Sequence, residues 1–181
     1  MHGVQYEKAI VPLLYRPFDT RFFVNLPELV DWSRPEVMSN MLFSSSLGLI
    51  SARSNKSKNM DHFLASRFIT EAKTGESTTQ SVLFPLWLYS GEAHRNDLHA
   101  DDLIRKLPGR SANLSPSFVA ALCEAIGLGA SDWFADKPTA PLNAEKIFQY
   151  LYAVLHSPEY RQRYAGFLRI DFPRIPVPGS R

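Results

Sequence analysis

Three helix-start signals after residue 110 constrain the fold of this chain more than any other feature. Ser115-Pro116 and Ser157-Pro158 each place a capping serine before a proline, a pair that favours the first turn of a helix. Asn143 can cap a further helix between them, and Gly127 can end the first one. Apolar side chains recur at helical spacing after each signal. We therefore predict a helical subdomain over residues 111–181.

The middle one of these helices is expected to be buried, because its apolar side chains lie nearly all round it. The last helix carries an aromatic stripe at helical spacing, formed by Tyr160, Tyr164 and Phe167. Such stripes usually belong to a core, so we predict that these three rings pack against the preceding helix. After Asp171 two prolines favour an extended exit of the chain.

Short apolar runs separated by polar connectors predict strands within residues 1–90. Residues 33–36 indicate a helix start before an apolar stripe at 37–42, and the polar residues 91–109 predict a loop or a weakly ordered insertion. Pro12 lies inside the first run and indicates an edge position, because proline cannot donate to a strand ladder. The connectors at 54–59 and 74–80 resemble long, exposed hairpin loops. The predicted strands span residues 10–15, 21–25, 47–53, 63–70 and 82–89.

Together these elements predict an α+β fold, with a twisted, mainly antiparallel sheet and long loops in the first half and helices in the second. We place the boundary between residues 1–110 and 111–181 and expect the two parts to pack as one unit. A chain of 181 residues is long enough for one domain with a core. Its 45% hydrophobic and 21% charged residues exclude wholesale disorder.

Cysteine content and hydropathy indicate the compartment. Cys123 is the only cysteine, so the chain forms no internal disulfide and no cysteine-based metal cluster. No apolar run approaches the roughly 18 residues of a membrane span, and the first residues lack the apolar core of a signal peptide. We therefore expect a soluble, cytoplasmic protein that has no membrane partner.

The distribution of charge is more informative than the formal net charge of +2. Basic residues gather in two segments, 53–73 and 161–181, which together favour a basic face. Lysine and arginine at strand ends can neutralise DNA phosphates, while arginine, asparagine and glutamine can read base edges. A solvated hairpin tip explains the same residues and stays open as an alternative. The candidate DNA-binding residues are Arg53, Asn55, Lys56, Lys58, Arg67, Lys73, Thr78 and Gln80.

Motifs for catalysis are nearly absent from the sequence. It contains no glycine-rich phosphate loop, no G-x-S-x-G elbow and no methyltransferase cofactor loop, and we predict no catalytic, cofactor or metal residues. The pair His94 and His99 matches no common ligand spacing. Asp61, Glu71 and Lys73 fit the permissive pattern of a small Mg²⁺-dependent nuclease, which is the enzymatic alternative. Strand-end charges that face solvent explain these three residues more simply.

One long segment carries a family resemblance. Residues 147–176 are similar to the signature segment of the C-terminal target-recognition (specificity) domain of type ISP restriction-modification enzymes, and related segments occur in large bacterial helicase–methyltransferase proteins. Shorter stretches agree and follow in the same order. They are YRPFDTR at 15–21, WSRPEVMSNM at 32–41, LGLISAR at 47–53 and SVLFPLWLY at 81–89.

The resemblance implies a module that recognises a sequence in double-stranded DNA and has no catalysis of its own. The S-adenosylmethionine, ATP and Mg²⁺ of such enzymes would be used by other domains of the same polypeptide, so no cofactor is expected in this chain. The chain stops at residues 176–181, where relatives continue, so we expect a truncated or stand-alone fragment. A second alternative is a docking fragment that binds DNA weakly; it predicts an exposed apolar patch near the C-terminal helices.

Overall fold

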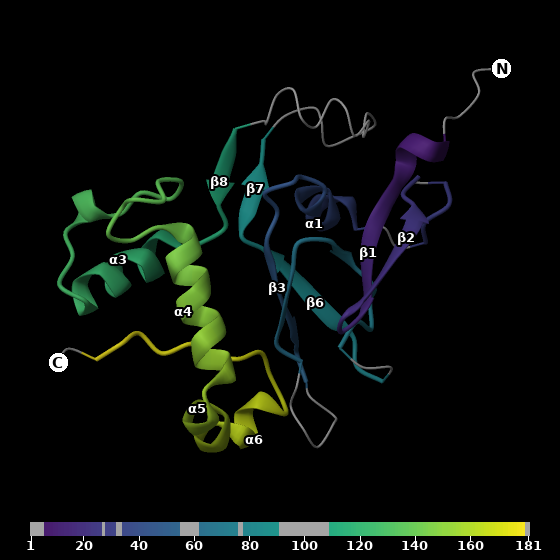
Figure 1. Ribbon diagram of the computed structural model, residues 1–181. Helices are drawn as coiled ribbons and strands as arrows, with labels where there is room; N and C mark the ends of the chain where they lie inside the picture. The colour runs from purple at the N-terminus through teal and green to yellow at the C-terminus, as the bar shows by residue number, and fades with distance from the viewer. Residues whose placement is uncertain are drawn as a thin grey trace.

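A computed structural model describes residues 6–26, 28–31, 34–54, 62–75, 78–90 and 109–179. Its strands form three small sheets, and the longer helices gather beside them (Figure 1). The predicted α+β class is confirmed. The strands are β1 Ile10–Arg16, β2 Asp19–Val24, β3 Gly48–Ala52, β4 Leu64–Ser66, β5 Ile69–Thr70, β6 Ser81–Pro85, β7 Trp87–Tyr89 and β8 Arg110–Ala112. The α-helices are α1 Pro35–Met38, α3 Pro116–Ala125, α4 Ala144–His156, α5 Pro158–Arg163 and α6 Ala165–Leu168, and the 3-10 helices are η1 Tyr6–Ala9, η2 Ser39–Met41 and η4 Ala130–Asp132.

The first sheet has the strand order β2-β1-β5. β1 and β2 form an antiparallel hairpin, whereas β1 and β5 run parallel and pair only from Leu13 and Ile69 onward. Pro12 therefore lies in the middle strand, and the predicted edge position is wrong. The strand tolerates this proline because the described ladder to β5 begins one residue later.

The other two sheets are antiparallel, with the orders β4-β3-β6 and β7-β8. The prediction of a mainly antiparallel arrangement is therefore confirmed, as is the hairpin between β3 and β4. A buried cluster joins the first two sheets beneath α1. It consists of Met41, Ile50, Ile69 and Leu83.

Two of the predicted strands are each divided between two sheets. The run 63–70 breaks after Ser66, whose hydroxyl donates to the Phe68 carbonyl and accepts from the Phe68 N–H, each at 2.9 Å. The run 82–89 breaks at Leu86, whose N–H donates to the Leu47 carbonyl at 2.7 Å. Because β5 and β6 belong to different sheets, the connector 74–80 joins two sheets and is not the predicted hairpin loop.

The helices begin where the capping residues predict them. Pro116 starts α3, and Gly127 beyond its end has the positive φ of 73° that a glycine adopts without strain. The Asn143 side chain accepts a hydrogen bond from the Lys146 N–H at 2.9 Å, which caps α4. The expectation that α4 is buried all round is wrong, because Glu145, Lys146 and other residues of its outer face are exposed.

The last predicted helix is also divided, at Tyr164, into α5 and α6. Tyr160 is buried and Tyr164 is half-buried, as predicted. Phe167 is 70% exposed, so its predicted place in the core is wrong. The turn at Tyr164 rotates α6 relative to α5, so the helical spacing no longer holds Phe167 on the buried face.

The corner formed by α4, α5 and α6 packs against Phe63, on the loop side of the β3–β4 hairpin (Figure 1). Phe63 is 1% exposed, and its carbonyl oxygen lies 2.9 Å from His156 Nε2. The buried cluster between corner and sheet consists of Phe63, Leu155, Tyr160 and Leu168.

The predicted boundary between residues 1–110 and 111–181 stays a prediction. The strand β8 begins at residue 110.

An ion pair between Arg110 and Asp136 joins β8 to the segment before α4. The guanidinium of Arg110 donates to both carboxylate oxygens of Asp136 and lies 4.1 Å from the centre of the Trp87 ring. The hydrogen bond from Arg110 holds the pKa of Asp136 below its ordinary value of 3.8. It raises the pKa of Arg110 in turn.

We expect Asp136→Asn to lower the free energy of unfolding at neutral pH by no more than about 1 kcal/mol, because the carboxylate is half exposed. A carboxyl group whose pKa is depressed in the folded state stabilises above its unfolded pKa and loses this effect as pH falls through the folded value. The difference between wild type and variant in urea unfolding should therefore shrink as pH falls below 3.8. Asp31→Asn removes an exposed carboxylate and is the matched control. A difference that is the same at every pH would contradict the assignment.

Candidate nucleic-acid interface

The ends of β3 and β6 meet at one end of their sheet. Ala52 pairs with Ser81 in the last step of the β3–β6 ladder, so Arg53 and Gln80 follow this pair on neighbouring strands. The Ser81 N–H donates to the Ala72 carbonyl at 2.7 Å, which brings the start of the β5–β6 connector to the same end.

The turn of the β1–β2 hairpin lies beside this connector. Arg16 Nη1 is 2.6 Å from Glu71 Oε2, and the Thr74 hydroxyl donates to the Leu14 carbonyl at 3.1 Å. In Figure 1 these segments lie below the labels of β3 and β6. We call this region the loop end, and define it as residues 16–19, 53–54, 71–75 and 78–80.

Four of the candidate DNA-binding residues come together at the loop end. Arg53, Lys73, Thr78 and Gln80 are all exposed there, although Arg53 and Lys73 are twenty positions apart in the chain. Their side chains combine cations, which can contact phosphates, with hydroxyl and amide groups, which can contact base edges. The structure does not test their binding to DNA, which stays a prediction.

Arg67 is the described candidate that the fold does not bring to this end. It follows Ser66, which pairs with Gly48 at the start of β3, whereas Arg53 follows the last residue of that strand. The length of β3 separates the two arginines, roughly 15 Å at about 3.3 Å per residue. Asn55, Lys56 and Lys58 lie outside the described residues.

The C-terminal segment contributes charge beside Arg53. Asp171 lies between two arginines, with Oδ1 3.8 Å from Arg53 Nε and Oδ2 3.9 Å from Arg174 Nη2. Both arginine side chains are largely exposed. Arg174 and Arg53, which belong to the two separate basic segments, therefore both lie beside Asp171, which sequence separation alone does not reveal.

Sequence reasoning missed a stacked group in the β1–β2 hairpin. Two guanidinium groups lie over the ring of Tyr15, that of Arg16 at 4.1 Å and that of Arg21 at 3.8 Å from its centre. Arg21 is also ion-paired with Asp19 at 2.9 Å, and the hydrogen bond that it donates to this carboxylate raises the pKa of Arg21. The run YRPFDTR could have predicted this group. Its Pro17-Phe18 turn brings Tyr15 and Arg21, which flank the turn, onto adjacent strands.

The geometry does not favour the nuclease alternative. The Glu71 carboxylate is ion-paired with Arg16 and also accepts the Lys73 N–H at 2.8 Å, so its charge is already compensated. Asp61, His94 and His99 lie outside the described residues. Within the described ranges there is no group of three or more histidine, cysteine, aspartate or glutamate residues that could hold a metal ion.

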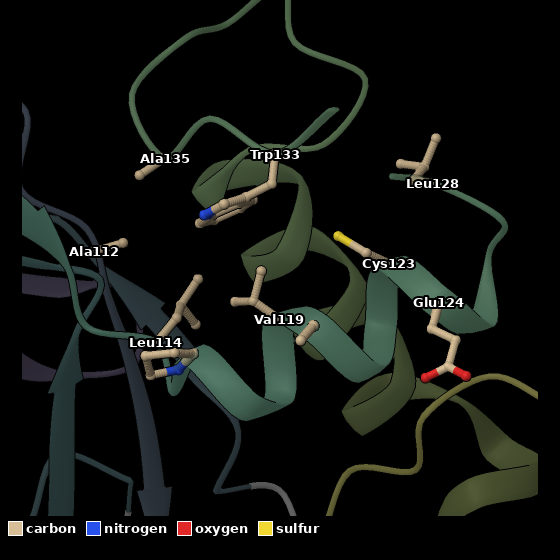
Figure 2. A pocket seen from close by; sticks show the side chains of 10 residues that line it. Ala112, Leu114, Val119, Cys123, Glu124, Leu128, Trp133 and Ala135 are labelled. Atoms are coloured by element: carbon tan, nitrogen blue, oxygen red, sulfur yellow. The ribbon is translucent and has the colours of Figure 1, made fainter. Parts of the chain in front are cut away.

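A separate pocket of about 560 Å³ lies between α3, β8 and the segment around Trp133 (Figure 2). Its walls are mainly apolar, and the buried Cys123 contributes a sulfur atom to them. In Figure 2 the carboxylate of Glu124 points away from that sulfur. None of the lining residues is a histidine, so the pocket shows no nucleophile–base pair.

Comparison with known proteins identifies the family. The chain matches the type ISP C-terminal specificity domain over residues 4–181, and it therefore belongs to this family. The resemblance read from the sequence is confirmed. No curated protein matches the chain significantly. In the part of the chain that the structure describes, no helix is both long and apolar enough to span a membrane.

Three solved structures share the fold, and the match to each covers 97% of this chain. The cryo-EM structure of a DrdV–DNA complex has a TM-score of 0.66 at 24% identity. A nuclease-deletion mutant of the type ISP restriction-modification enzyme LlaGI with a DNA substrate mimic has a TM-score of 0.59 at 21% identity. The ATP-dependent type ISP enzyme LlaBIII bound to DNA has a TM-score of 0.63 at 19% identity. The chain spans 14%, 12% and 10% of these proteins, in the same order.

Proposed function

We propose that this chain recognises a sequence in double-stranded DNA on behalf of a larger restriction-modification polypeptide, and that it catalyses no reaction itself. The observation that carries this proposal is the match to a specificity domain over nearly the whole chain. The solved structures with the same fold are complexes with DNA or a DNA mimic, which supports the same partner here.

The loop end supplies chemistry that suits this role. Arg53 and Lys73 contact phosphates and position the domain, while Gln80 and Thr78 reach base edges. Lys56 and Lys58, which follow Arg53 in the sequence, add further phosphate contacts. Under this proposal S-adenosylmethionine, ATP and Mg²⁺ are held by other domains of the polypeptide, and this chain holds none of them.

One observation favours docking to those other domains as a second role. Phe167 and Ile170 are each 70% exposed beside a pocket of about 520 Å³ at the C-terminal corner. An exposed apolar patch near the C-terminal helices is what the docking alternative predicts. This patch adjoins the loop end, since Asp171 lines the same pocket and lies 3.8 Å from Arg53.

Selection from a pool of random duplexes tests the proposal. We expect the chain to enrich one short sequence motif over successive rounds, because base contacts discriminate by about 1–3 kcal/mol per base pair. Incubation of the chain with plasmid and Mg²⁺ tests the nuclease alternative, which predicts that the plasmid is cut. Recovery of a pool that is still random would contradict DNA sequence recognition and would leave docking as the role of the domain.

A further inference from the structure

Phe18 exposes an apolar ring to solvent and has a backbone conformation that is unfavourable for a phenylalanine. It lies at the tip of the β1–β2 hairpin, where Pro17 and Phe18 form a two-residue turn between the paired residues Arg16 and Asp19. Its side chain has 102% of the reference exposure, so it packs on no other part of the described chain. Its φ of 64° lies in the left-handed region, where a bulky residue is an outlier and glycine or asparagine is preferred.

Contacts just behind the tip brace the hairpin that carries this ring. Arg16 and Arg21 both stack on Tyr15, and each is also ion-paired, with Glu71 and Asp19. These contacts tie both strands of the hairpin to one another and to the β5–β6 connector just behind the tip. The hairpin backbone therefore loses little conformational freedom when the tip contacts a partner.

The chemistry around the tip favours duplex DNA as that partner. The guanidinium groups of Arg16 and Arg21 lie on both sides of the turn, and the exposed Lys73 follows Glu71 at the same end. A two-stranded ribbon fits the major groove of DNA, where the thymine C5-methyl group is the apolar feature of the base edges. An aromatic ring can contact that methyl group, while cations behind it contact the phosphates.

We propose that the β1–β2 hairpin enters the major groove and that Phe18 contacts the methyl group of a thymine in the recognised sequence. This inference rests on the proposed function, since it names one base contact of the same DNA-binding surface. It assigns a specificity-determining role to a residue outside the 53–80 segment, in which the sequence places all the candidate contacts.

The test uses the duplex that the wild-type chain enriches from the random pool, made either with thymine or with uracil, which lacks only the methyl group. We expect Phe18→Asn to weaken binding of the thymine duplex by roughly tenfold, and uracil to weaken wild-type binding by a similar factor. Uracil should then change binding to the Phe18→Asn variant less than about twofold, because the methyl contact is already lost. The dissociation constants of the two proteins for the two duplexes, four in all, measure how far the effects of the ring and of the methyl group depend on each other.

Phe134→Ala is the matched control, because Phe134 is also an exposed phenylalanine but lies in the segment before α4, outside the hairpin and the loop end. It should bind both duplexes as wild type does. The Phe18→Asn variant should melt no lower than wild type, because asparagine adopts a positive φ more readily. Equal binding by Phe18→Asn and wild type, an unchanged uracil effect in the variant, or an enriched motif without thymine would each overturn the inference and leave the proposed function intact. Failure of wild type to enrich any motif would instead overturn the proposed function and this inference with it.

Discussion

Replacing Arg53, Lys56 and Lys58 together by alanine is expected to weaken binding to duplex DNA by roughly 10- to 100-fold at about 0.1 M salt. Each lost phosphate contact also lowers the slope of log K against log salt concentration by about 0.9, so the slope should fall by up to about 2.7. Arg53 is exposed at the end of β3, and its contact with Asp171 at 3.8 Å is a weak one that DNA can replace. Fluorescence anisotropy over a series of salt concentrations measures both quantities.

A charge-matched variant shows whether DNA binding depends on where the three positive charges lie or only on the net charge of the chain. Arg67→Ala, Lys137→Ala and Lys146→Ala together also remove three positive charges, but none of these residues lies at the loop end. This variant should retain binding within about threefold of wild type and most of the salt slope. Equal losses in the two triple variants would contradict a localised interface and would indicate a non-specific effect of total charge.

Phe63→Ala is expected to lower the free energy of unfolding by about 3–5 kcal/mol. The ring is 1% exposed and is packed between the sheet and the corner, in contact with Leu155, Tyr160 and Leu168. The guanidinium of Arg161 lies 5.6 Å from the centre of the same ring. The substitution therefore leaves a cavity at the junction that positions the corner beside Arg53.

Phe22→Ala provides the comparison for this loss, because Phe22 is 72% exposed and should change stability by less than about 0.5 kcal/mol. Urea unfolding of the three proteins measures the difference. A loss below about 1 kcal/mol in Phe63→Ala would contradict the packing of the corner around Phe63.

Local signals made the helix starts predictable. A proline in the first turn has the φ that the turn needs, and the side chain of Asn143 or Ser157 accepts from an N–H of the turn that follows it, so these signals act within a few residues. Pro116, Asn143 and Pro158 therefore mark the starts of α3, α4 and α5 correctly. The turn at 16–19 is local in the same sense, because Pro17 fixes its own φ.

Strand limits and partners were less predictable because they depend on distant residues. The run 82–89 is continuous in hydropathy, yet it is divided because Leu86 bonds to Leu47 and the strand beyond it pairs with β8. Arg53 and Arg67 belong to one basic segment of the sequence, but the β3–β4 ladder places them at opposite ends. Phe167 keeps helical spacing with Tyr160, yet the turn at Tyr164 moves it to the surface.

The most direct test of the central claim is the ratio of two dissociation constants for the wild-type chain, measured at one salt concentration. One duplex carries the motif enriched from the random pool, and the other carries the same bases in scrambled order. A specificity domain predicts that the enriched duplex binds at least about 100-fold more tightly, because several mismatched base pairs each cost about 1–3 kcal/mol. A ratio near one for every duplex tried would contradict sequence recognition by this chain.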